Sequence, residues 1–240
     1  MSEDRIYATA REHIVDFAFD ESVAAVFPDM IRRSVPGYGD VVALTGLIAE
    51  RFARAGTRCY DLGCSLGAVT LAMRRRVRAP DVRIVAVDNA EAMLKRCREN
   101  VRAEQGPPVD VICADIRDVP IENASVVVLN FTLQFVPPAD RAALLARIHA
   151  GMTPGGVLAL SEKVAFADAQ TQRFHETLHL DFKRANGYSE LEISQKRTAI
   201  ENVLVPDTLE VHQARLAAAG FRRVEHWYRC FNFASLVAFA

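Results

Sequence analysis

The sequence predicts an α/β protein with a doubly wound, mostly parallel sheet and an antiparallel edge strand. The chain has 240 residues, a length within the range of one α/β domain. Apolar segments alternate with helical segments between residues 57 and 162. Segments such as VRIVAVD at 82–88 lack polar alternation, which is typical of strands that helices cover on both faces.

The expected elements follow one another with no internal repeat and no low-complexity linker. Residues 1–56 are expected to be mostly helical, with a break at VPGYG, 35–39. Thr-Pro-Gly-Gly at 153–156 is expected to end a helix. Strands are expected at 57–61, 82–88, 109–114, 125–131 and 157–162, and helices at 68–78, 90–104 and 139–152.

The last third of the chain predicts more helix and then a hairpin. A helical stretch is expected at about 166–219. Two apolar segments, 222–231 and 234–240, flank the short connection Asn232-Phe233, which is typical of a hairpin at the sheet edge. We therefore interpret 1–240 as a single domain with an N-terminal helical cover (about 1–56) and a helical insertion (about 166–219).

Composition excludes several classes of protein. The net charge of -1 does not fit a protein that binds nucleic acid by itself. The N-terminus lacks the apolar region of a secretory signal, and no apolar run is long enough to span a membrane. Five scattered cysteines without a CxxC pair indicate free thiols in a reducing compartment, so a cytoplasmic location is expected.

The first candidate for a ligand site is the loop YDLGCSLG at 60–67. It follows a predicted strand and opens a helix, and its glycines allow the backbone to approach a ligand closely. It is not a P-loop, because no Gly-Lys-Ser/Thr follows. It is not a regular G-x-G-x-x-G either, since Ser65 stands between Gly63 and Gly67. A dinucleotide is therefore a weaker interpretation than another nucleoside ligand.

Polar residues also end the following strands. Asp88 ends the second strand and Asn89 follows it, Asp115 ends the third strand, and Asn130 ends the fourth. An acid at the position of Asp88 commonly accepts ribose hydroxyls, and ligands bind outside the carboxyl ends of such strands. Each residue alone could simply end a strand or cap a helix. Their shared position favours a nucleoside pocket.

Asp61, directly before the glycines, narrows the range of possible ligands further. An acid there suits a ligand that carries an ammonium and a second cation, as S-adenosylmethionine does. The loop therefore indicates the Rossmann-like, class I S-adenosylmethionine-dependent methyltransferase fold. Enzymes that methylate base amines often carry Asn/Asp-Pro-Pro-aromatic after the fourth strand. This chain has Asn130-Phe131-Thr132-Leu133 instead, which disfavours that activity.

Two further motifs allow other interpretations. HETLH at 175–179 has the H-E-x-x-H spacing of a zinc site, with Glu176 as base. Chance occurrence on a polar helix face is the better interpretation in this fold. Candidate third zinc ligands are Glu190, Glu192 and Glu201. The second motif is a group of basic residues that could gather around an anionic substrate. The alternative is that they only form a solvated helix surface. They are Lys183, Arg184, Lys196 and Arg197.

Five segments together resemble the carboxy-S-adenosyl-L-methionine synthase family, from about residue 18 to the C-terminus. The block at 181–197 is the most specific, and HETLH is not part of the family pattern. Residues 1–17 show no clear match. The segments are FPDMI (27–31), RSVPGY (33–38), YDLGCSLG (60–67), NFTLQF (130–135) and DFKRANGYSELEISQKR (181–197).

The resemblance implies an enzyme that converts S-adenosyl-L-methionine and prephenate to carboxy-S-adenosyl-L-methionine and phenylpyruvate. A separate transferase then uses the product to modify a wobble uridine of tRNA to 5-oxyacetyluridine. The resemblance further implies a bacterial homodimer, a single S-adenosylmethionine-binding domain and no metal. Two alternatives share the loop and Asp88: an ordinary small-molecule methyltransferase, and a non-enzymatic module that binds S-adenosylmethionine.

The resemblance also implies the residues of the site. Tyr38 would cover the cofactor, and Arg197 would pair with the new carboxylate as the catalytic residue, in cis or from the partner subunit. The cofactor-binding residues carried over from the family are Tyr38, Gly63, Cys64, Ser65, Asp88, Asn89, Asp115, Ile116, Asn130 and Arg197.

Overall fold

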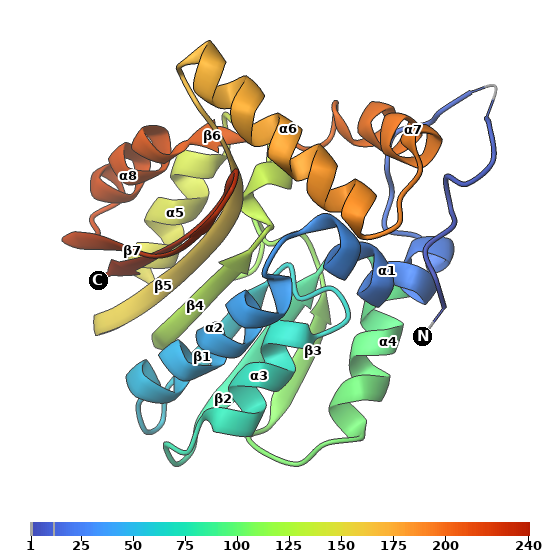
Figure 1. Ribbon diagram of the computed structural model, residues 1–240. Helices are drawn as coiled ribbons and strands as arrows, with labels where there is room; N and C mark the ends of the chain where they lie inside the picture. Colours follow the sequence, from blue (N-terminus) through green and yellow to red (C-terminus); the bar gives the residue numbers. More distant parts are fainter. Residues whose placement is uncertain (1, 12) are drawn as a thin grey trace.

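The computed structural model describes residues 2–11 and 13–240 and has one central sheet (Figure 1). The strand order is β3-β2-β1-β4-β5-β8-β7, and the short β6 pairs with β5 off this path. The first five strands in this order, β3, β2, β1, β4 and β5, run parallel to one another. The bounds are β1 (Arg58–Leu62), β2 (Arg83–Asp88), β3 (Val109–Cys113), β4 (Ala124–Asn130), β5 (Met152–Ala165), β6 (Asp207–Thr208), β7 (Arg223–Cys230) and β8 (Phe233–Phe239).

The predicted antiparallel strand is β8. It pairs antiparallel with β5 on one side and with β7 on the other, so the hairpin forms this edge of the sheet and β7 is outermost. Helices follow β1, β2 and β4 as predicted, whereas the described residues between β3 and β4 form no helix. The bounds of the helices are α1 (Glu21–Ser34), α2 (Tyr38–Phe52), α3 (Ala68–Arg76), α4 (Glu91–Arg102), η1 (Leu133–Phe135), α5 (Arg141–Ala150), α6 (Ala169–Ala185), α7 (Glu190–Ile200) and α8 (Leu209–Ala218).

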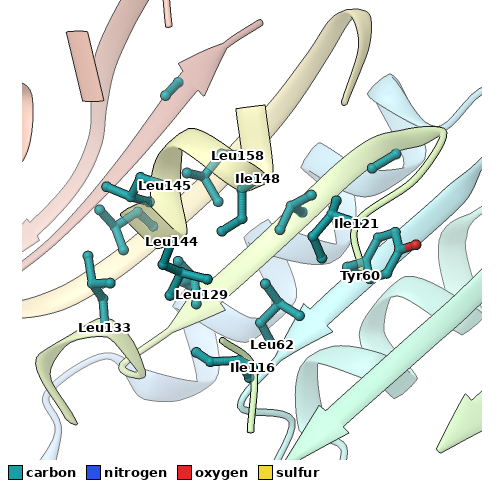
Figure 2. Close-up of a cluster of buried hydrophobic side chains, with 14 of the residues drawn as sticks. Tyr60, Leu62, Ile116, Ile121, Leu129, Leu133, Leu144, Leu145, Ile148 and Leu158 are labelled. Carbon is teal, nitrogen blue, oxygen red and sulfur yellow. The ribbon is translucent and has the colours of Figure 1, made fainter. Parts of the chain in front are cut away.

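Both faces of the sheet are buried, which explains the continuous apolar strands. On β4, Val126 and Val128 pack with residues of α2 and α3, whereas Val127 and Leu129 pack with residues of α5 and α8. Figure 2 shows the α5 side chains Leu144 and Leu145 beside Leu129. Successive strand residues point to opposite faces, so a central strand such as β4 has apolar residues at nearly every position, whereas the outer strands β3 and β7 are more exposed and carry polar residues.

A third layer lies over the carboxyl edge of the sheet. Figure 1 shows α1, α6 and α7 together above the ends of the parallel strands. The N-terminal segment, residues 2–11 and 13–19, joins this layer. Gln195 of α7 binds the carbonyls of Tyr7 and Thr9 at 2.9 Å each, and the amide of Phe17 donates to the carbonyl of Ala199.

Three expectations were wrong in detail. The described residues of 2–20 contain no helix, because their polar groups are satisfied by contacts with α7 and α1 that the local sequence does not reveal. Residues 153–156 belong to β5, which starts at Met152 and runs to Ala165. The stretch 166–219 is interrupted by β6. Among the described residues, no helix combines the length and apolar character needed to cross a membrane.

Arg141 fixes the loop that follows β4. Its side chain is fully buried and donates to the carbonyls of Gln134, Val136 and Val205 at 2.9–3.1 Å. It also pairs with Asp207 at 2.6 Å. One guanidinium therefore joins the 133–136 loop, α5 and β6.

We predict that Arg141→Leu lowers the free energy of unfolding by about 3 kcal/mol, because buried acceptors lose their donor while Asp207 keeps only Arg215. Chemical denaturation measures this change. The matched control is Arg76→Leu, which removes a half-exposed pair with Glu50 and should cost less than about 1 kcal/mol. Equal costs for the two variants would contradict the role of Arg141.

Candidate active site

A cavity of about 450 Å³ lies at the carboxyl edge of the sheet, under α1, α6 and α7. Its size is typical of small-molecule sites. The structure brings together almost all the residues that the sequence predicted for cofactor binding, and Asp61 joins them. Arg197 alone is not part of the lining, although its charge acts on the lining residues Lys163 and Lys183. The predicted residues that line the cavity are Tyr38, Gly63, Cys64, Ser65, Asp88, Asn89, Asp115, Ile116 and Asn130.

The loop after β1 has a tight backbone that only small residues allow. Gly63 and Gly67 both have φ of 85°, and a Cβ on Gly63 would stand 2.3 Å from the Thr132 hydroxyl oxygen. Ser65 also has a positive φ, 52°, and its amide donates to Asp88 at 2.8 Å. The backbone at the middle position of the loop is therefore tied to the end of β2.

Three buried oxygen atoms on the cavity wall have no hydrogen-bond partner among the described residues. They are Oδ1 of Asp61, Oγ of Ser65 and Oδ1 of Asn130. Buried polar groups in folded proteins are nearly always paired, so such acceptors indicate a missing donor. A ligand with an ammonium and hydroxyl groups would supply these donors. S-adenosylmethionine carries both, so the residues fit this group.

The cavity also favours positive charge near Asp61. Burial raises the pKa of Asp61 to about 6, although its other oxygen accepts a 2.6 Å hydrogen bond from Thr70. Burial and then the charge of Asp61 raise the pKa of Tyr38. Burial raises the pKa of Asp88 as well, against hydrogen bonds from the amides of Ala90 and Ser65. A bound cation would stabilise the ionised carboxylates.

Asp115 is anchored at the other end of the cavity. Its carboxylate binds the side chain of Arg117 at 2.7 Å, and Arg117 reaches on to Asp140. The Arg117 guanidinium holds the pKa of Asp115 below its ordinary value. Asp115 is therefore a fixed, ionised acceptor beside the buried side chain of Ile116.

Aromatic side chains form a wall that the sequence analysis did not assign. Phe131, directly after Asn130, has an unusual φ of 59°, and its ring lies 6.2 Å from that of Tyr38 and 6.0 Å from that of Phe233. Strained backbone of this kind persists where the surrounding structure enforces it. The other aromatic residues of the wall come from separate segments, so no local pattern predicts them. They are Phe17, Phe19, Phe27 and Phe135.

The HETLH motif does not form a zinc site. His175 stacks on Phe166 at 4.5 Å, whereas His179 lies 2.8 Å from the carbonyl oxygen of Ser34 and packs edge-on against Phe233. Burial and the charges of Lys183 and Lys163 lower the pKa of His179 to about 3, so its ring is neutral. Within residues 2–11 and 13–240, no group of three or more His, Cys, Asp or Glu side chains could hold a metal ion.

Two of the three candidate third zinc ligands have other roles. Glu192 forms the predicted capping box with Ser189, and Glu190 pairs with Arg184. Arg184 also pairs with Asp181 and points away from the cavity. The sequence-predicted basic cluster is thus split. Lys183 and Lys196 line the cavity, Arg184 lies outside it, and Arg197 is exposed on α7.

The fold and the cavity define the class of the protein, and comparison with known proteins agrees. A family model described as "Methyltransferase domain" matches residues 59–156. A putative S-adenosyl-L-methionine-dependent methyltransferase from Methanococcus maripaludis is 20% identical, with a TM-score of 0.58 and 96% of each chain covered. Human N-acetylserotonin methyltransferase is 16% identical, with a TM-score of 0.60 over 91% of this chain and 55% of that one. The chain therefore has the class I methyltransferase fold.

Closer relatives show the particular family. The carboxy-S-adenosyl-L-methionine synthase of Geobacter metallireducens is 63% identical, covering 98% of this chain and 97% of the relative. The protein of the same name from Trichlorobacter lovleyi is 61% identical with the same coverage. The protein belongs to the carboxy-S-adenosyl-L-methionine synthase family, as the sequence predicted.

We predict that binding of S-adenosylmethionine weakens at acid pH. If the ligand ammonium pairs with Asp61, it needs the ionised form of this carboxyl group, whose pKa is about 6. The affinity should be constant well above pH 6 and fall by at most about tenfold per pH unit below it. Calorimetric titration at several pH values measures this trend. Asp61→Asn should bind weakly with a flatter pH profile, and an unchanged profile in that variant would exclude Asp61 as the titrating group.

Proposed function

We propose that the protein converts S-adenosyl-L-methionine and prephenate to carboxy-S-adenosyl-L-methionine and phenylpyruvate. The observation that carries this proposal is the 63% identity, over nearly the whole length, to a protein named carboxy-S-adenosyl-L-methionine synthase. The cavity supports it, because unpaired acceptors and lysine side chains line the same space. The acceptors suit the cationic substrate, and the lysines suit the anionic one.

We assign the cofactor-binding residues as the sequence suggested. In the proposed complex, Asp61 and Asn130 accept from the ammonium end of S-adenosylmethionine, and Asp88 with Asn89 binds the ribose. Asp115 and the backbone at Ile116 face the adenine. Further contacts of the proposed site come from Tyr38 as a cover and from Gly63, Cys64 and Ser65 of the loop. One S-adenosylmethionine-binding domain, with an N-terminal cover and a helical insertion, would hold the ligand.

The proposed chemistry needs orientation more than a strong protein base. Prephenate aromatises as it loses carbon dioxide and hydroxide, and the hydroxide takes a proton from the sulfonium methyl group to form water. The resulting ylide attacks the carbon dioxide, and the new carbon–carbon bond gives the carboxymethyl sulfonium. Water would quench the ylide. The aromatic wall of Phe17, Phe19 and Phe135 would keep bulk water away.

Arg197 is proposed to act from the partner subunit of a homodimer. Its side chain is exposed on α7 and does not line the cavity of its own chain. An Arg on an exposed helix face can enter a second copy of the site when two chains pack by a two-fold axis. There it would stabilise the forming carboxylate. The proposal includes a cytoplasmic location and a downstream tRNA carboxymethyltransferase, with no direct binding of nucleic acid.

The first test is to incubate purified protein with both substrates and identify the products by mass spectrometry. We expect a species heavier than S-adenosylmethionine by one carbon dioxide, together with phenylpyruvate. Release of S-adenosylhomocysteine with a methylated acceptor would instead establish an ordinary methyltransferase. Tight binding of S-adenosylmethionine without any turnover would favour a binding module.

The role of Arg197 is tested by mixing two inactive variants. Arg197→Leu keeps a complete pocket, whereas Gly63→Val disrupts the cofactor loop, because a side chain at this position would clash with Thr132. If Arg197 acts across the dimer, an equimolar mixture allowed to exchange subunits should recover about a quarter of wild-type activity, since one site in each heterodimer is complete. Each variant alone is the control. No recovery after proven exchange would contradict the assignment to the partner subunit.

A further inference from the structure

Three lysine side chains line one end of the cavity, and two of them have no anionic partner. Lys196 is explained by the fold, because its ammonium lies 3.3 Å from the Asp4 carboxylate and 3.3 Å from the Tyr188 hydroxyl. Lys163 and Lys183 form no ion pair within 4.0 Å with any described residue. The sequence analysis singled out Lys183 but missed Lys163, because β5 extends past the predicted end of the strand.

These two lysines are placed close to each other by β5, β8 and α6. Lys163 pairs across the sheet with Phe233, and the Phe233 ring lies 4.9 Å from that of His179. Lys183 follows His179 by one helical turn and so shares its face of α6. The backbone amide of Lys163 is fixed by the side chain of Gln134 at 2.9 Å. Two cationic side chains are thus built into one region of the cavity wall.

Their environment disfavours the charge that they carry. Burial, followed by the charges of Lys196, Lys163 and Arg197, lowers the pKa of Lys183 to about 7. Burial lowers the pKa of Lys163, with partial compensation from Glu176. Buried charges are normally paired, and like charges in one cavity oppose each other. An anionic ligand would relieve both costs.

A purely structural explanation fits less well. Lysine side chains often lay an apolar stem on the protein and reach water with the ammonium. Arg184, the next residue along the chain, does turn outward to the carboxylates of Asp181 and Glu190. Lys183 instead faces the cavity although the same surface carboxylates are close in sequence.

The sheet order separates these lysines from the nucleoside end of the cavity. Asp88 ends β2 and Asp115 follows β3, which lie on one side of β1. Lys163 lies on β5, on the other side of β1 and beyond Asn130 of β4. A ligand whose adenosine lies over β2 and β3 would therefore leave the lysine end free for a second substrate.

We propose that Lys163 and Lys183 form the subsite that binds the side-chain carboxylate of a dianionic second substrate, which in the proposed function is prephenate. This inference rests on that function. Of the two carboxylates of prephenate, the ring carboxylate leaves as carbon dioxide, and a lysine pair around it would stabilise the reactant and slow its loss. The side-chain carboxylate persists in phenylpyruvate. The subsite should therefore bind substrate and product alike.

The test uses full-length Lys163→Gln and Lys183→Gln with Arg184→Gln as the matched control. Loss of a hydrogen bond to a charged group should raise the KM for prephenate about 10- to 100-fold in each lysine variant. Because the lost binding is shared by substrate and transition state, kcat should change by less than about threefold. Inhibition by phenylpyruvate should weaken in parallel. The affinity for S-adenosylmethionine and all constants of the control should stay within about twofold.

Lys183→Arg checks the role of charge and should largely restore the KM that Lys183→Gln loses. An unchanged KM for prephenate in both Gln variants, with wild-type turnover intact, would overturn the subsite alone. An equal loss of S-adenosylmethionine affinity would also overturn it, because the lysines would then support the pocket as a whole. Absence of carboxylated product with the wild-type protein would overturn the proposed function and this inference together.

Discussion

The cavity depends on one constraint, the burial of the Asp61 carboxylate. One of its oxygens is satisfied by Thr70, and the other faces the cavity without a partner among the described residues. A carboxylate held in this way is costly without a cation beside it. The carboxylate stays buried because β1 lies inside the sheet, between β2 and β4, and helices cover both faces of the sheet. The site is thus complete only when a positively charged ligand is bound.

The charges of the cavity are arranged along the sheet. Unpaired acceptors lie at Asp61, Ser65 and Asn130, near the middle, and the lysine pair lies beyond β4. A cationic substrate and an anionic substrate would therefore lie next to each other, which is the arrangement that the proposed carboxyl transfer requires. The aromatic wall encloses this region, and the N-terminal segment contributes Phe17 and Phe19 to it.

The sequence predicted those residues of the site whose positions are determined by the ends of parallel strands. Gly63, Asp88 and Asn130 each lie at the carboxyl end of a recognisable strand. Parallel strands end at one edge of the sheet, so the proximity of these residues follows from the order of the elements. The fold class followed from the same apolar segments. The start of β5 was mispredicted because Thr-Pro-Gly-Gly normally ends an element, whereas here residues 153–156 lie in the strand.

The remaining features depend on contacts between distant segments. Residues 1–56 were predicted to be mostly helical, yet the described residues before α1 lie against α7 without a helix, where contacts of Asp4 and Gln195 hold them. Lys163 of β5 and Phe17 of the N-terminal segment reach the cavity from segments far apart in the sequence. The exposure of Arg197 could not be predicted either, because it depends on how α7 packs on the N-terminal segment.

In the proposed reaction, carbon dioxide passes from prephenate to the methyl carbon of S-adenosylmethionine. Prephenate with an isotopic label in its ring carboxylate allows this transfer to be followed. The label should appear in the carboxyl group of the S-adenosylmethionine product, even in the presence of excess unlabelled bicarbonate. An unlabelled product carboxyl group, or a label found only in dissolved carbonate, would contradict the proposed transfer.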